Sequence, residues 1–171
     1  MKEQLYSAGG FIIFLVMCLG AQLTGSFLTM PAIRSGWYLA LEKPFFNPPA
    51  WLFGPVWTVL YFIMALSAWM VWRQESEDPL VRPALYLFFV QLLFNVIWPA
   101  LFFSIRRPGW AMVEISLLWL LILATILIFH KVNKWAAWLL APYLAWVLYA
   151  VILNSAIWWL NRGGSGGSVA G

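Results

Sequence analysis

Five stretches of this chain are each apolar over the roughly 20 residues that a helix needs to cross a bilayer. They lie at about 7–28, 50–72, 80–104, 109–130 and 135–160. Nearly all of the charged residues fall in the connections between these stretches. The pattern predicts an all-α integral membrane protein, built as a bundle of five transmembrane helices that cross the bilayer in turn.

The composition supports lipid as the solvent for most of the surface. Of the 171 residues, 64% are hydrophobic and 9% are charged, whereas soluble domains carry about 25% charged residues. No polar stretch is long enough for a second domain, so residues 1–162 are interpreted as one membrane domain. The tail 163–171, GGSGGSVAG, has the composition of a flexible linker.

The basic residues do not orient the chain across the membrane. With five spans, one side receives Lys2, Arg73, Arg82, Lys131 and Lys134, and the other receives Arg34, Lys43, Arg106, Arg107 and Arg162. Cytoplasmic loops normally carry an excess of Lys and Arg. Because the two counts tie, the sequence leaves open both the sidedness and the identity of the membrane.

Tryptophan is the most unusual feature of the composition, with 13 residues. Most lie near the ends of spans, as expected for rings at the headgroup level. Trp57, Trp98, Trp119 and Trp146 lie deeper in their spans. These four either line a cavity or pack against neighbouring helices and lipid.

Several polar residues lie inside the spans. In the third span, Gln91, Asn95, Trp98 and Phe102 recur at the spacing of one helix face, and Trp146, Ala150 and Asn154 do so in the fifth. Glu114 is the acidic residue of the fourth span, where a lipid-facing carboxylate is costly. The amides either form hydrogen bonds between helices or fix a ligand together with the aromatic rings.

Prolines interrupt three of the spans, at Pro55, Pro99 and Pro142. Each removes a backbone donor and frees a carbonyl group. Membrane helices tolerate such breaks where a neighbour or a cavity satisfies the freed group. The prolines therefore indicate either simple kinks or room between the helices.

Constellations for catalysis, metal binding and nucleic-acid binding are missing from the sequence. The chain has a single histidine, His130, and a single cysteine, Cys18, so it offers no paired metal ligands and no Ser/His/Asp or Cys/His set. The basic residues are scattered rather than clustered on one face. We expect no metal site, no obligatory cofactor and no nucleic-acid partner.

Ordered motifs over residues 35–160 resemble a known family. They are Trp37-Tyr38, Leu41-Glu42-Lys43-Pro44, Pro48-Pro49, Gly54-Pro55-Val56-Trp57, Leu60-Tyr61, Gln91, Asn95, Trp98, Phe102-Phe103, Gly109-Trp110-Ala111, Pro142-Tyr143-Leu144-Ala145-Trp146, Ala150 and Leu153-Asn154. In this order and spacing they resemble the tryptophan-rich sensory protein family, also called translocator proteins or peripheral benzodiazepine receptors.

The resemblance implies five helices around a ligand pocket that opens toward loop one, the connection between the first and second spans. It also implies binding of porphyrins or other tetrapyrroles. By positional match, the ligand-binding residues would be Trp57, Asn95, Trp98, Trp110, Glu114, Trp146 and Ala150. It also implies a homodimer. Sterol binding is not carried over, because Ser155 stands where animal members have a tyrosine in a proposed cholesterol motif.

Four functions remain open at this stage. The leading hypothesis is a membrane sensor or regulator that binds a tetrapyrrole, with porphyrin as a ligand rather than a cofactor. The alternatives are a light- and oxygen-dependent porphyrin-degrading enzyme with Trp57 and Trp146 as redox groups, a transporter of porphyrin or a small hydrophobic ligand, and a structural protein that its tryptophans merely anchor.

Overall fold

The structure, a computed structural model, describes residues 2–74 and 78–163, with side chains from residue 8 onward. The predicted Gly/Ser tail lies outside these residues, apart from Gly163. The elements in chain order are α1 (Lys2–Arg34), α2 (Trp37–Ala40), α3 (Ala50–Trp72), α4 (Val81–Pro99), the π-helix η1 (Ala100–Ser104), α5 (Pro108–Val132), α6 (Lys134–Leu139) and α7 (Ala141–Asn161).

Five helical runs within the described residues are long and apolar enough to cross a membrane: Ala8–Arg34, Ala50–Trp72, Val81–Ser104, Pro108–Val132 and Lys134–Asn161. The prediction of an all-α bundle with five spans is confirmed. The last span is a composite of α6 and α7, with Pro142 in the first turn of α7, where a missing backbone N–H costs least.

The first helix continues to Arg34 rather than ending near residue 28. Two residues beyond its end, Gly36 has a left-handed φ of 74°, and its N–H donates to the Ile33 carbonyl at 3.1 Å. A one-turn helix, α2, then follows within loop one (residues 35–49). The part of loop one that holds Pro44, Pro48 and Pro49 is not helical, because proline lacks a backbone donor and disfavours helical geometry in the residue before it.

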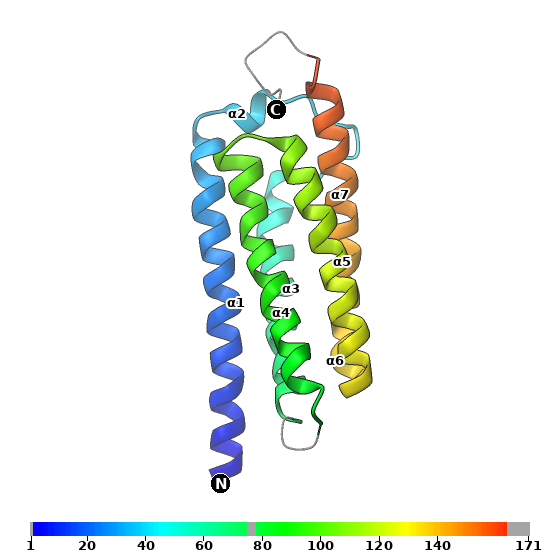
Figure 1. Ribbon diagram of the computed structural model, residues 1–171. Coiled ribbons are helices and arrows are strands. Elements are labelled where there is room, and N and C mark those ends of the chain that lie inside the picture. The colour runs from blue at the N-terminus through cyan, green and yellow to red at the C-terminus, as the bar shows by residue number, and fades with distance from the viewer. Residues whose placement is uncertain (1, 75–77, 164–171) are drawn as a thin grey trace.

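Short connections set which helices are neighbours. Residues 105–107 join η1 to α5, and Asn133 alone separates α5 from α6. The Asn133 side chain accepts hydrogen bonds from the backbone N–H groups of Trp135 and Ala136 at 3.0 and 3.1 Å, which caps α6. In Figure 1, α1 lies at one edge of the bundle and α2 crosses the end opposite the N-terminus.

The end of the bundle away from loop one is densely packed. Small and aromatic residues alternate there, including the buried Ala65, Ala68, Phe88 and Phe129. Gly10 of α1 lies directly against the Trp72 ring of α3. Close packing through small residues is what holds membrane helices together, since lipid gives no hydrophobic drive for association.

The loop-one end is more open. After Pro99 the third span leaves α-helical geometry and continues as the π-helix η1, in which the Ile105 N–H reaches back to the Ala100 carbonyl at 2.8 Å. A π-turn changes the direction in which the following side chains point. Here it places Phe102 and Phe103 beside the space between the helices, while Pro99 itself lines that space.

Candidate ligand-binding site

A cavity of about 370 Å³ lies in the loop-one half of the bundle. Its walls come from the second half of α1, from α2, from the first half of α3, from α4 and η1, and from α5 and α7. Sites for small ligands are typically about 300–1,000 Å³ and mostly apolar. The size and lining of this cavity are those of a small-molecule site.

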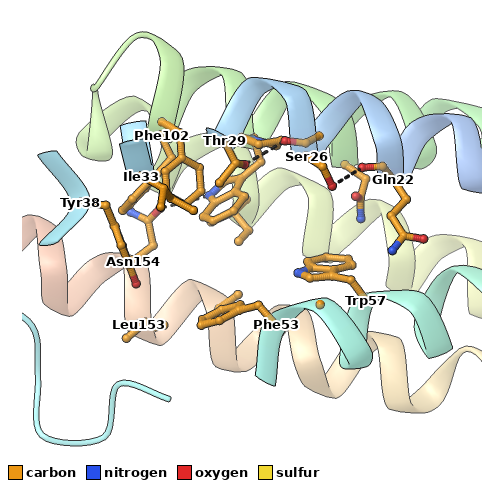
Figure 2. Close-up of a pocket in the computed structure, with 18 of the residues that line it drawn as sticks. Gln22, Ser26, Thr29, Ile33, Tyr38, Phe53, Trp57, Phe102, Leu153 and Asn154 are labelled. Carbon is orange, nitrogen blue, oxygen red and sulfur yellow. Dashed lines mark hydrogen bonds between the residues drawn. The ribbon is translucent and has the colours of Figure 1, made fainter. Parts of the chain in front are cut away.

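Aromatic rings form much of the wall. Trp98 stacks on Phe102, with centroids 5.3 Å apart and planes at 28°. Phe53 meets Trp146 edge-on, with centroids 6.0 Å apart. Figure 2 shows Phe53 and Trp57 on one side of the space, opposite the side chains of α1. Rings on opposed walls suit a flat, largely apolar ligand.

A buried chain of hydrogen bonds forms the deep end of the cavity. The Tyr61 hydroxyl donates to Asn95 Oδ1, Asn95 Nδ2 donates to the Tyr143 hydroxyl at 2.7 Å, and that hydroxyl donates to Gln91 Oε1 at 2.8 Å. The chain links α3, α4 and α7. Two of its members, Tyr61 and Asn95, also line the cavity. Their side chains already form hydrogen bonds within the protein.

Asn154 of α7 also links neighbouring helices by hydrogen bonds, nearer loop one. Its Oδ1 accepts from the Trp98 indole at 3.1 Å, and its Nδ2 donates to the Pro108 carbonyl at 2.8 Å. Trp98 and Asn154 both line the cavity. The amide therefore holds the indole in place and ties it to the start of α5.

Loop one is fastened to α7 at two points. The Tyr149 hydroxyl donates to the Phe46 carbonyl at 2.7 Å. Asn161 bonds Glu42 twice, since its Oδ1 accepts from the Glu42 N–H at 3.0 Å and its Nδ2 donates to the Glu42 carbonyl at 2.9 Å. These bonds hold loop one over the end of the bundle.

Tyr38 and Lys43 mark the loop-one edge of the cavity. Tyr38 lines it, and the Lys43 ammonium lies 4.8 Å from the Tyr38 ring centroid while donating to the Leu39 and Leu41 carbonyls at 3.2 and 3.0 Å. Burial raises the pKa of the Tyr38 phenol, and partial burial lowers the pKa of Lys43.

Comparison with known proteins settles the family. The model of the TspO/MBR family matches residues 12–160. The chain belongs to the TspO/MBR family.

Relatives from distant organisms share this family. The chain is 40% identical to the tryptophan-rich protein TspO of Archaeoglobus fulgidus, over 87% of this chain and 94% of the relative. It is 38% identical to the tryptophan-rich sensory protein of Cereibacter sphaeroides, over 88% and 90%. It is 40% identical to the translocator protein of Homo sapiens, over 77% and 78%.

In this TspO/MBR protein, five of the seven predicted ligand-binding residues line the cavity. They are Trp57, Asn95, Trp98, Trp146 and Ala150. Of the four deep tryptophans, Trp119 does not line it, and its indole nitrogen is buried without a hydrogen-bond partner in the described part of the chain. A ligand role for the five lining residues remains a prediction.

The other two predicted residues lie outside the lining of the cavity. Trp110 is 59% exposed, on the outside of α5. Glu114 is buried, and neither carboxyl oxygen has a hydrogen-bond partner among residues 2–74 and 78–163. Their neighbours Ile115 and Leu118 are the residues by which α5 reaches the cavity.

The first span contributes a wall of the cavity that was not predicted from the sequence. Gln22, Ser26 and Thr29 of α1 line the cavity. Their i, i+4, i+7 spacing places them on one helix face, and polar residues repeated this way in an apolar span were the available signal. Across the described residues, no group of three His, Cys, Asp or Glu side chains could hold a metal ion.

Proposed function

We propose that this TspO/MBR protein binds a tetrapyrrole in the cavity of the loop-one half and acts as a membrane sensor or regulator. The observation that carries the proposal is the lining: indole and phenyl rings on opposed walls, with few polar groups between them. A planar macrocycle offers both faces to such rings. The sensory role rests on the name of the Cereibacter sphaeroides relative.

The fifth span gives the proposal a specific geometry. Trp146 and Ala150 are one helical turn apart on α7, and both line the cavity. The small side chain of Ala150 leaves room beside the indole, so a ring system can lie against that face of α7. A larger residue at position 150 would fill the room that the ligand needs.

A titration in the dark tests this geometry. Protoporphyrin is added to detergent-purified protein while tryptophan fluorescence is recorded. We expect saturable quenching, weakened roughly three- to tenfold in Trp146→Ala through loss of one aromatic contact, and weakened in Ala150→Leu through loss of space. The matched controls are Trp138→Ala and Ala145→Leu, at exposed positions outside the cavity.

The controls decide how the result is read. Binding that weakens only in the cavity variants supports the proposal. Absence of saturable binding, or equal losses in the control variants, would overturn it.

Light-driven porphyrin degradation is a second candidate, because the indoles of Trp57 and Trp146 line the same cavity. In this reaction the illuminated porphyrin is oxidised and O₂ is reduced. An indole would act as the relay, losing an electron toward O₂ and regaining one from the porphyrin. The bound complex is illuminated in air, in argon and in the dark while porphyrin absorbance is followed. A loss of porphyrin absorbance that needs both light and O₂ and that slows in Trp57→Phe and Trp146→Phe favours degradation. A loss of absorbance that neither substitution changes is ordinary photobleaching.

A further inference from the structure

The cavity wall formed by α1 is its most polar part. Gln22, Ser26 and Thr29 are the polar residues of this wall, and the outer side of α1 is largely apolar and exposed. Thr24, on the same helix, is exposed and does not line the cavity. Gln22, Ser26 and Thr29 therefore meet whatever occupies the cavity, although Ser26, like Thr24, is exposed.

The hydroxyl groups of Ser26 and Thr29 each already donate their hydrogen atom to a backbone carbonyl of α1. Ser26 Oγ donates to the Gln22 carbonyl at 2.9 Å, and Thr29 Oγ1 donates to the Gly25 carbonyl at 2.8 Å. A hydroxyl has one hydrogen and two acceptor lone pairs. Toward the cavity, Ser26 and Thr29 can therefore act only as acceptors unless they give up these bonds.

The orientation of the Gln22 amide is fixed by its neighbour on α3. The Thr58 hydroxyl donates to the Gly54 carbonyl at 3.0 Å, so it can only accept from Gln22, whose Nε2 lies 2.9 Å away. This bond joins α1 to α3 and uses one of the two hydrogen atoms of the Gln22 amide nitrogen. It marks the end of the polar wall farthest from loop one.

The facing walls offer hydrogen-bond donors in few places. The amide of Asn95 and the indole of Trp98 donate within the protein. Trp57 lies across the space from Ser26 and Thr29 (Figure 2), and its indole N–H has no partner among the described residues. Around Ser26 and Thr29 the cavity is thus asymmetric, with two acceptor oxygens on α1 facing the indole N–H of Trp57 on α3, while the second amide hydrogen of Gln22 lies at the end of the wall farthest from loop one.

We propose that Ser26 and Thr29 form a hydrogen-bond-accepting subsite that selects ligands carrying an O–H or N–H group on the edge that meets α1. A carbonyl or carboxylate on that edge would face two acceptors with no hydrogen between them, which is costly in apolar surroundings. Ligand carboxylates are therefore turned away from Ser26 and Thr29. The inference rests on the proposed function and adds an orientation to it.

Two porphyrins with the same ring, one with this donor and one with it methylated, test the subsite. Hematoporphyrin carries two hydroxyethyl groups at the ring edge, and its di-O-methyl ether has the same ring without those O–H groups. We expect wild-type protein to bind hematoporphyrin roughly three- to tenfold tighter, the value of one neutral hydrogen bond. In Ser26→Ala/Thr29→Val the ratio of the two affinities should fall toward one.

Thr24→Val is the matched control. Thr24 Oγ1 donates to the Gly20 carbonyl at 2.8 Å, the same bond that Thr29 makes, but on the lipid side of α1. The control therefore removes an equivalent hydroxyl from the helix without touching the cavity. It should keep the full preference, which separates loss of the subsite from a general effect of removing a hydroxyl from α1. A size penalty of the two ether methyl groups would instead persist in the Ser26→Ala/Thr29→Val variant.

The outcomes separate this inference from the proposed function. If both porphyrins bind and the ratio falls only in the Ser26→Ala/Thr29→Val variant, the subsite is supported. If both bind and the ratio is the same in wild type, variant and control, the subsite is refuted while tetrapyrrole binding stands. If neither binds to wild type, the proposed function and the subsite fall together.

Discussion

Replacing Tyr143 by phenylalanine tests whether the buried hydrogen-bond chain holds the bundle together. The hydroxyl it removes accepts from Asn95 Nδ2 at 2.7 Å and donates to Gln91 Oε1 at 2.8 Å. Tyr143, Gln91 and Asn95 are all buried, and neither Tyr143 nor Gln91 lines the cavity, so water does not reach Gln91 to replace its lost partner. Gln91 Nε2 already has no partner in the described part of the chain.

The expected cost follows from counting these two bonds. Hydrogen bonds between membrane helices are worth about 0.6 kcal/mol on average and up to about 1.7 kcal/mol. Two of them, each leaving a buried polar group behind, give a loss of about 1–3 kcal/mol. Tyr61→Phe, which removes only the bond to Asn95 Oδ1, should cost about half as much.

Reversible unfolding in mixed dodecylmaltoside and SDS micelles, followed by far-ultraviolet circular dichroism, measures both variants. Both substitutions conserve shape, so changes in packing are small. A Tyr143→Phe variant that is as stable as the wild type, or that loses no more than Tyr61→Phe, would refute the view that this chain links α3, α4 and α7 energetically.

Three further predictions concern other parts of the bundle. Gly10→Ala should destabilise the protein by about 1–3 kcal/mol, because the new methyl group would overlap the Trp72 ring; Gly9→Ala, in open space, is the control, and equal melting temperatures would contradict the close contact. Asn161→Ala should release loop one and speed its cleavage by added protease, with unchanged helix content; an unchanged cleavage rate would show that other contacts hold the loop. Glu114→Gln should melt at or above the wild-type temperature, since neither carboxyl oxygen has a described partner to lose; a marked drop would reveal one.

The sequence by itself determined the number and type of spans. In lipid, every backbone polar group must be satisfied within its own segment or a closed barrel, so each apolar stretch of about 20 residues has to become a helix. This constraint is local, and it can be read without knowing the neighbours. The resemblance and the spacing of Asn95, Trp98, Trp146 and Ala150 also located one part of the cavity lining.

Only the tertiary structure decided what each helix face meets. Helical periodicity places Trp57 and Trp119 on faces of their helices, but it does not say that Trp57 meets the cavity and Trp119 does not. The Tyr143 hydroxyl pairs with residues 48 and 52 positions earlier in the chain, a relation that no local pattern contains. The polar residues Ser26 and Thr29 of α1 likewise line a cavity only because the start of α3 lies across from them. Helical spacing predicts that they share a face, but not which helix that face meets.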